Sequence, residues 1–159
     1  MRIGHGYDLH RLEPGSGLKL GGHYIACPYA IVAHSDGDVV LHALCDALLG
    51  ATALGDIGRL FPDADPQYKG KDSLFFLNHV YNCIKSKGYT VINVDITIQA
   101  ETPKISPHAD PMKTIIANTL NLPVDAVSIK AKTMEKLGPI GERQAIAAHV
   151  VTLLIGENS

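Results

Sequence analysis

The chain has 159 residues, of which 46% are hydrophobic and 19% are charged, and its formal net charge is -2 at pH 7. This composition predicts one globular domain and excludes a disordered chain. It offers no basic surface for nucleic acid, and no apolar stretch is long enough to span a membrane.

Cysteine usage indicates the cellular compartment. Cys27, Cys45 and Cys83 are scattered along the chain and form no CxxC pair, so we interpret them as reduced thiols. No signal peptide is visible at the N-terminus. These observations predict a cytoplasmic protein, and without a linker or repeat we expect a single domain over residues 1–159.

The first third of the chain contains clear signals for regular structure. Residues 2–10 predict a strand, and the Gly-Gly pair within residues 18–25 predicts a hairpin. Residues 35–51 predict a helix, with Ser35 as its N-cap and Asp38 at the capping-box position.

The rest of the chain alternates helices and strands around one long loop. Residues 51–71 are rich in Gly, Pro and Asp and predict a surface loop, which at this length is usually functional. Helices are predicted at 72–88, with Asp72 or Ser73 as cap, and at 108–122, and strands at 89–99, 126–133 and 145–155. The predicted fold is α+β, a small mixed β-sheet covered on one face by helices.

The stretch GHGYDLHRL, residues 4–12, contains a pair of residues that suits a metal ion. Asp8 and His10 are two apart, so on a strand their side chains project from the same face. A carboxylate beside an imidazole provides half of a zinc site. The alternative for an isolated pair of this kind is a polar strand end that enters a turn.

His42, inside the predicted helix, is the candidate third ligand. The alternative is a core histidine bonded to a backbone carbonyl. Asp38 and Asp46 lie four residues before and after His42, on the same helical face, where a carboxylate would orient the ring. Three protein ligands would leave one open position on zinc, as in catalytic sites.

Seven stretches of the chain carry a family resemblance. They are, in order, GHGYDLH, AHSDGDVVLHAL, GDIGRLFPDADP, KGKDS, NVDITI, PKISPH and EKLG. Together they resemble the 2-C-methyl-D-erythritol 2,4-cyclodiphosphate synthase family, from Met1 to about Ile155. The resemblance implies a phosphorus-oxygen lyase of the non-mevalonate isoprenoid pathway, which converts 4-diphosphocytidyl-2-C-methyl-D-erythritol 2-phosphate into a cyclic diphosphate and CMP. It also implies a homotrimer with active sites between subunits, and no nucleic-acid or membrane partner.

The resemblance also implies the metal ligands. Asp8, His10 and His42 become ligands of zinc, and Asp8 and His10 become substrate contacts as well, whereas His5 is left as a structural residue. Glu135 becomes the ligand of a second, harder cation, magnesium or manganese, that would bridge two phosphates of the substrate. Taken alone, Glu135 is better explained as a solvated helix residue.

The implied substrate contacts fall into separate segments. His34 and Thr133 correspond to transition-state stabilisers, and Ser35, with His34, to a phosphate contact, although the bare motif also suits an N-cap. The other implied contacts form four groups. Contacts to hydroxyl groups fall on Asp56, Ile57 and Gly58, and a flap over the erythritol is formed by Phe61, Pro62, Asp63, Ala64 and Asp65. The cytosine pocket is formed by Ala100, Pro103, Lys104, Ile105 and Ser106, and further contacts beside Thr133 are Lys132, Met134 and Glu135.

One stretch departs from the family pattern. PIGERQA stands where many members read like FTGRGEG, so Pro139 replaces an aromatic residue and Glu142 stands where arginine is frequent. In many members that arginine lines the mouth of a cavity on the trimer axis, which can hold an isoprenoid diphosphate. We expect Glu142 to repel such a ligand, unless the adjacent Arg143 turns inward and restores the site.

Two other functions fit parts of the pattern. A zinc-dependent phosphoesterase would activate water at the metal, but the sequence offers no residue that we can name as its general base. A non-catalytic nucleotide-binding or metal-binding module would normally close its zinc with a fourth protein ligand, and none is suitably spaced.

Overall fold

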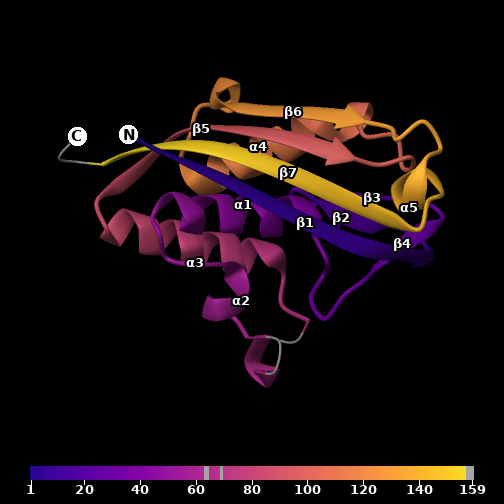
Figure 1. The fold of residues 1–159 in the computed structure, drawn as a ribbon, viewed down its shortest axis with the longest axis horizontal. Helices are drawn as coiled ribbons and strands as arrows, with labels where there is room; N and C mark the ends of the chain where they lie inside the picture. The colour runs from indigo at the N-terminus through magenta and orange to yellow at the C-terminus, as the bar shows by residue number, and fades with distance from the viewer. Residues whose placement is uncertain (63–64, 69, 157–159) are drawn as a thin grey trace.

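The computed structural model describes residues 1–62, 65–68 and 70–156, which form an α+β domain around one mixed sheet (Figure 1). The sheet has five strands in the order β4-β1-β7-β5-β6. Strands β5 and β6 pair in parallel, and the other neighbours are antiparallel. The bounds are β1 Arg2–Pro14, β4 Tyr29–Val32, β5 Tyr89–Gln99, β6 Val127–Lys132 and β7 Ala145–Gly156.

Helices cover one face of this sheet, as the sequence predicted (Figure 1). The long helices are α1 Val39–Ala51, α3 Ser73–Ser86 and α4 Ala109–Leu120, and the short ones are α2 Ile57–Leu60 and α5 Gly138–Gly141. The predicted hairpin forms a separate small sheet of β2 Leu18–Leu20 and β3 His23–Ile25. Among the described residues, no helix combines the length and the apolar character needed to cross a membrane.

Two glycines of β1 let helix α1 lie directly against the sheet. A Cβ atom added to Gly4 would fall 1.8 Å from the carbonyl oxygen of Ala47, and one added to Gly6 would fall 1.8 Å from that of Ala43. No other residue type permits so close an approach of strand and helix. The alternation of β1 then turns Asp8 and His10, the next residues on the same face, toward α1.

The other face of the sheet exposes apolar side chains. On β1, Ile3 is 73% exposed and Tyr7 and Leu9 are each 46% exposed, and Val151 on the neighbouring strand β7 is 41% exposed. His5 lies among them, with its Nε2 atom 3.3 Å from Nδ1 of His149. This face carries apolar groups that no described part of the chain covers.

The structure corrects three local predictions. Ser35 does not cap helix α1, because Asp38 is the N-cap and its carboxylate accepts hydrogen bonds from the N–H groups of Val40 and Leu41. Strand β4 was not predicted, and the loop at 51–71 contains helix α2 and a short 3-10 turn at Pro66–Tyr68. The other predicted helices and strands are present, and Asp72 is the cap of α3.

Candidate active site

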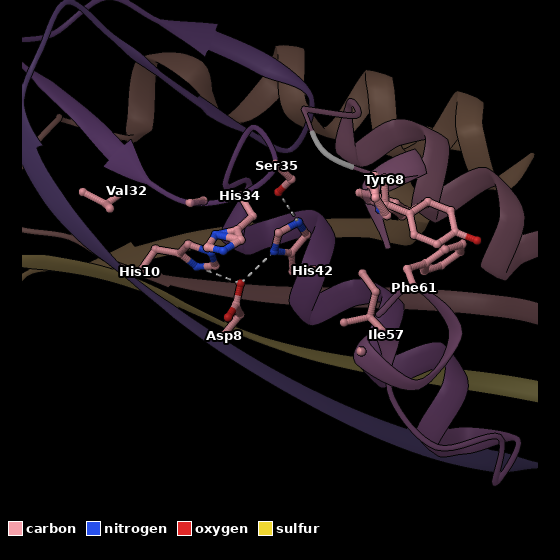
Figure 2. Close-up of a pocket in the computed structure, with 13 residues that line it drawn as sticks. Asp8, His10, Val32, His34, Ser35, His42, Ile57, Phe61 and Tyr68 are labelled. Atoms are coloured by element: carbon pink, nitrogen blue, oxygen red, sulfur yellow. Dashed lines mark hydrogen bonds and ion pairs between the residues drawn. The ribbon is translucent and has the colours of Figure 1, made fainter. Parts of the chain in front are cut away.

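A cavity of about 920 Å³ opens where β1, β4, α1, α2 and α3 meet (Figure 2). Both polar and aromatic side chains line it, so it can take a ligand with a charged end and an apolar or sugar part. Its lining residues are Asp8, His10, Val32, Ala33, His34, Ser35, His42, Ile57, Gly58, Phe61, Pro66, Tyr68 and Phe76.

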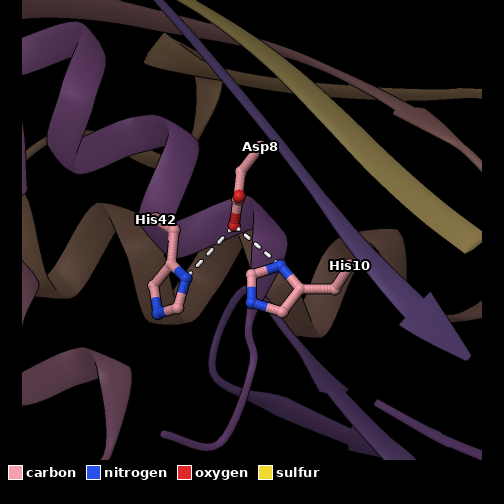
Figure 3. A group of neighbouring side chains, drawn as sticks. All are labelled: Asp8, His10 and His42. Atoms are coloured by element: carbon pink, nitrogen blue, oxygen red, sulfur yellow. Dashed lines mark hydrogen bonds and ion pairs between the residues drawn. The ribbon is translucent and has the colours of Figure 1, made fainter. Parts of the chain in front are cut away.

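Three donor groups converge at one end of the cavity (Figure 3). Oδ2 of Asp8 lies 3.1 Å from Nδ1 of His10 and 3.1 Å from Nδ1 of His42. Ligands that share a tetrahedral zinc ion at its usual bond lengths stand about 3.3 Å apart. The spacing of these atoms therefore suits one metal ion.

A polar atom without a partner supports the same interpretation. In the described part of the chain, Nδ1 of His10 is the one buried side-chain nitrogen or oxygen with no hydrogen-bond partner, because its contact with Asp8 is not aligned as a hydrogen bond. A buried polar atom of this kind is costly unless something else binds it. The donor set of one carboxylate and two imidazoles fits zinc.

Charge within the triad shifts two pKa values. Burial raises the pKa of Asp8, but its close contacts and charge interactions with His10 and His42 outweigh burial and lower the pKa from 3.8 to about 2. Burial lowers the pKa of His42, but the hydrogen bond and the charge of Asp8 outweigh burial and raise it above 6.5. Asp8 is therefore a carboxylate at neutral pH, as a metal ligand must be.

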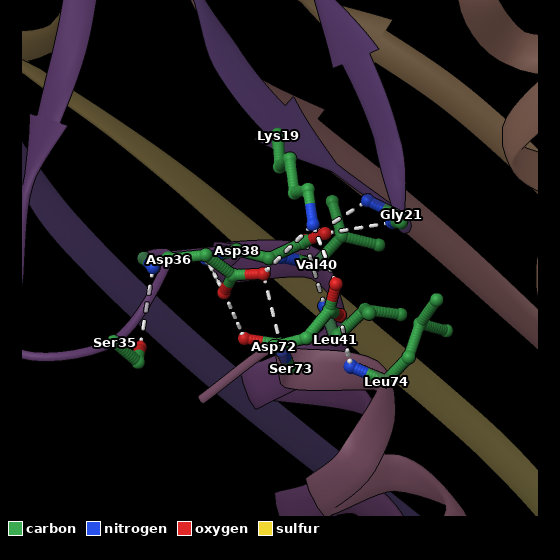
Figure 4. A network of polar contacts seen from close by, with 12 residues as sticks. Lys19, Gly21, Ser35, Asp36, Asp38, Val40, Leu41, Asp72, Ser73 and Leu74 are labelled. Atoms are coloured by element: carbon green, nitrogen blue, oxygen red, sulfur yellow. Dashed lines mark hydrogen bonds and ion pairs between the residues drawn. The ribbon is translucent and has the colours of Figure 1, made fainter. Parts of the chain in front are cut away.

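The two carboxylates predicted to orient His42 make other contacts. Asp38 is fully buried, and its oxygens accept hydrogen bonds from the backbone N–H groups of Gly21, Gly22, Val40 and Leu41 (Figure 4). Asp46 accepts one from the N–H of Ile57 at 2.7 Å. Neither carboxylate is hydrogen-bonded to the His42 ring, which instead contacts Asp8, Ser35 and Ser73, so the predicted orienting roles of Asp38 and Asp46 are wrong.

Several predicted substrate contacts do gather around the triad. His34 and Ser35 line the cavity next to it, and Ile57, Gly58 and Phe61 line it on the side of α2 (Figure 2). Asp56 is exposed and caps α2, with Oδ1 accepting a hydrogen bond from the N–H of Arg59 at 2.8 Å. Pro62 and Asp65 follow in the same loop, whereas Asp63 and Ala64 lie outside the described residues.

The other predicted contacts form a second group at the ends of β5 and β6. The N–H of Ala100 donates to the carbonyl of Lys132 at 3.0 Å, and the N–H of Met134 donates to Glu101. The hydroxyl of Thr133 donates to Oε1 of Glu135 at 3.0 Å. Pro103 and Ile105 are buried, whereas Lys104 and Ser106 are exposed. No residue of this group is among those that line the cavity.

Sequence reasoning missed the aromatic wall of the cavity. Tyr68 and Phe76 line it, and both rings contact Phe61, with centroids at 5.2 and 4.8 Å. The one available signal was the spacing of aromatic residues along 61–76, which by itself also predicts an ordinary core. Ser73, which lies 2.9 Å from Nε2 of His42, gave no signal at all.

An α+β domain in which a possible metal site opens onto a mixed polar and aromatic cavity has the arrangement of an enzyme that acts on a small ligand. Comparison with known proteins gives the family. Residues 1–155 match the model of the YgbB family. The 2-C-methyl-D-erythritol 2,4-cyclodiphosphate synthase of Pseudomonas savastanoi pv. phaseolicola is 56% identical over 155 residues, which are 98% of this chain and 99% of that protein. The chain therefore belongs to the 2-C-methyl-D-erythritol 2,4-cyclodiphosphate synthase family, and the resemblance is confirmed.

Solved structures of the same family share the fold. A 2-C-methyl-D-erythritol 2,4-cyclodiphosphate synthase in its CDP-bound form has a TM-score of 0.90 and 39% sequence identity, with 97% of this chain and 100% of that chain covered. IspF of Plasmodium falciparum in complex with CDP has a TM-score of 0.87 and 39% identity, with 99% and 97% covered.

Proposed function

We propose that this protein converts 4-diphosphocytidyl-2-C-methyl-D-erythritol 2-phosphate into 2-C-methyl-D-erythritol 2,4-cyclodiphosphate and CMP. An oxygen of the 2-phosphate forms a bond with the β-phosphorus, and the bond from that phosphorus to the bridging oxygen breaks, so that CMP leaves with this oxygen. The observation that supports the proposal best is the convergence of Asp8, His10 and His42 beside His34 and Ser35 at one end of the cavity.

Positioning is the main task of the protein in such a reaction, because both reacting groups are anions. His34 and Ser35 are suitably placed to donate hydrogen bonds to phosphate oxygens. The loop of Asp56, Ile57 and Gly58 borders the same cavity, and we assign to it the hydroxyl groups of the erythritol or the ribose. The aromatic wall beside Phe61 excludes water from the reacting phosphates.

Two metal ions belong to the proposal. Zinc bound by Asp8, His10 and His42 would act as a Lewis acid on a phosphate oxygen of the substrate. Magnesium or manganese bound through Glu135 would neutralise the diphosphate. Thr133 lies beside Glu135, and we assign to it the second stabilising contact to the transition state.

We also propose that the enzyme is a homotrimer with shared active sites. The metal triad lies on β1 and α1, whereas Thr133 and Glu135 follow edge strand β6, and β7 and β5 lie between β1 and β6. One subunit thus carries the two predicted halves of the site in different places. The exposed apolar face around Ile3, Tyr7 and Leu9 gives neighbouring subunits a surface to bury.

The cytidyl half of the site is assigned to Ala100, Pro103, Lys104, Ile105 and Ser106, with Lys132 and Met134 beside them. Two observations support a cytidyl ligand: the solved relatives that hold CDP, and the contact between the 100–101 and 132–134 segments. We place the enzyme in the cytoplasm, because Cys27, Cys45 and Cys83 are all unpaired thiols.

Phosphorus NMR tests the reaction directly. The protein is incubated with the cytidyl substrate, zinc and magnesium, and we expect signals of a cyclic diphosphate and of CMP. The His42→Ala variant should lose both zinc and turnover. A linear bisphosphate that takes up ¹⁸O from labelled water would instead identify a phosphoesterase and overturn the proposal.

A further inference from the structure

The strongest unassigned feature is a chain of polar contacts that reaches from His42 through Ser73 and Asp36 to Lys19. Figure 4 shows its part from Ser73 to Lys19. Nδ1 of His42 faces Asp8, and Nε2 on the other side of the ring lies 2.9 Å from the hydroxyl oxygen of Ser73. Ser35 is farther from Nε2, at 3.4 Å. Ser73 is therefore the nearest partner of this nitrogen.

Asp36 holds the Ser73 hydroxyl in place. Ser73 is the first residue of α3, so its N–H has no partner within the helix, and it donates to Oδ2 of Asp36 at 3.1 Å. The Ser73 hydroxyl bonds to Oδ1 of the same carboxylate. The ammonium group of Lys19 lies 3.6 Å from Oδ2 of Asp36. Ser73 is fully buried, so these contacts are its only solvation.

The direction of these bonds fixes the proton on the His42 ring. A carboxylate only accepts hydrogen bonds, so the Ser73 hydroxyl must donate its single proton to Asp36. The Ser73 oxygen is then an acceptor toward His42, and Nε2 must carry the ring proton. Nδ1, the ring nitrogen that faces Asp8 at 3.1 Å, is therefore the nitrogen left to bind a metal ion.

We propose that Ser73 and Asp36 are positioning residues that hold His42 in the tautomer and orientation required for metal binding. The inference rests on the proposed metal site, and it assigns to Ser73 and Asp36 the role that sequence reasoning gave to Asp38 and Asp46. Groups that orient a metal-bound histidine typically change metal affinity by about 10- to 100-fold when they are removed.

Two variants test the two ends of this chain. Ser73→Ala removes the acceptor for the Nε2 proton. Asp36→Asn keeps the size. The Ser73 N–H donates to the Oδ2 position and the Lys19 ammonium group lies 3.6 Å from it, so the amide oxygen stays there and the NH₂ group faces the Ser73 hydroxyl. The hydroxyl must then turn its proton toward His42, which favours the tautomer that cannot bind metal through Nδ1.

The experiment measures zinc affinity by competition with a chelator, starting from metal-free protein. We expect Ser73→Ala and Asp36→Asn to bind zinc about 10- to 100-fold more weakly than the parent. Ser86→Ala is the matched control, because it removes a serine hydroxyl from the other end of α3, where it donates only to the carbonyl of Cys83. The control should bind zinc as the parent does.

A spectroscopic measurement separates positioning from a merely structural effect. Long-range ¹H–¹⁵N spectra at saturating zinc should show the His42 proton on Nε2 and the metal on Nδ1 in the parent and in Ser86→Ala. In Asp36→Asn the Ser73 hydroxyl no longer accepts this proton, so the Nε2–H signal should shift or be lost through exchange with water. Parent affinity in both variants, or an unchanged Nε2–H signal in Asp36→Asn, would overturn the inference. If the parent protein has no higher zinc affinity than the His10→Ala variant, the proposed metal site is overturned as well.

Discussion

Gly6 lies so close to Ala43 that the strand and the helix touch through their backbones. His42 directly precedes Ala43, so this contact sets the distance between the helix and the candidate metal ligands of β1. The Ala43 carbonyl would lie 1.8 Å from any Cβ atom at position 6, and as backbone it cannot turn aside.

Gly6→Ala should therefore damage both stability and metal binding. We expect a loss of about 2 kcal/mol or more in the free energy of unfolding, since a methyl group forced into a packed interface displaces the helix. Urea unfolding and zinc competition measure the two effects. Gly50→Ala is the control, because a Cβ there meets only the His5 carbonyl at 4.0 Å, and it should stabilise α1 by about 0.5–1 kcal/mol. Equal behaviour of the two variants would contradict this account.

The buried carboxylate of Asp38 predicts a second stability effect. In Asp38→Asn the amide nitrogen must replace one oxygen, and at the Oδ2 position it would face the N–H of Gly22. Two donors then face each other in a buried place, which costs about 1–3 kcal/mol. Asp38→Ala leaves all four N–H groups without their acceptor and should cost more. Chemical denaturation of the two variants checks the order, and a larger loss in Asp38→Asn would refute it.

The metal-free protein should show a pH-dependent contribution from the triad. The lowered pKa of Asp8 means that its contribution is present above pH 3.8 and is lost as the pH falls toward about 2. The raised pKa of His42 means that its contribution is present below pH 6.5 and is lost as the pH rises through the raised value. The difference in Tm between the parent and Asp8→Asn should thus be largest at about pH 4–6.5. A difference in Tm that does not vary with pH would contradict the ion pair between Asp8 and His42.

Shared active sites can be tested by mixing two inactive variants. His42→Ala disables the metal half of the site, and Glu135→Ala disables the other half. If each site takes one half from each of two subunits, random exchange in an equal mixture restores about one quarter of the sites. Activity is measured after the mixed subunits are dissociated and reassociated. A mixture that stays inactive while it reforms trimers would exclude sharing.

The segment that departs from the family pattern yields a prediction about ligands. Glu142 and Arg143 are both exposed, and Oε2 of Glu142 accepts a hydrogen bond from the side chain of Gln144 at 3.0 Å. Three copies of Glu142 around a trimer axis would repel a diphosphate, so we expect weak or no binding of geranyl and farnesyl diphosphate. Calorimetric titration measures it. Micromolar binding that disappears in Arg143→Ala would show that Arg143 restores the site.

The sequence predicted the fold well where the signal was local. The β-branched run at 89–99 and the capped helix after Asp72 both lie where their patterns placed them. Strand β4 was missed because Tyr29–Val32 is short and has no alternation, and only its pairing with β1 makes it a strand. The N-cap of α1 was misplaced because Ser35 and Asp38 both suit the position. Hydrogen bonds from Gly21 and Gly22 hold Asp38 at the N-cap position, and capping rules based on neighbouring residues do not include such contacts.

Prediction of the site from the sequence was likewise limited to local patterns. Asp8 and His10 form a pattern within one strand, and His42 was a candidate from its helix that the family resemblance then supported. The partner of the His42 ring, Ser73, lies 31 residues away in sequence, and its role depends on a third segment that contains Asp36. Ser73 becomes a partner of His42 only when two helices pack together. Such a partner cannot be predicted from the spacing of residues in the sequence.

The pairing of β1 with β7 also has a consequence for how the protein is made. Of the described strands, β1 is synthesised first and β7 last, yet they are neighbours from Arg2–Leu154 to Arg11–Ala145. While the chain is being synthesised, Asp8 and His10 belong to a strand whose central partner does not yet exist. Contacts between the two ends of a chain form late, because a large loop must close first. Asp8 and His10 therefore gain the central strand pairing that supports the proposed metal site only at a late step of folding.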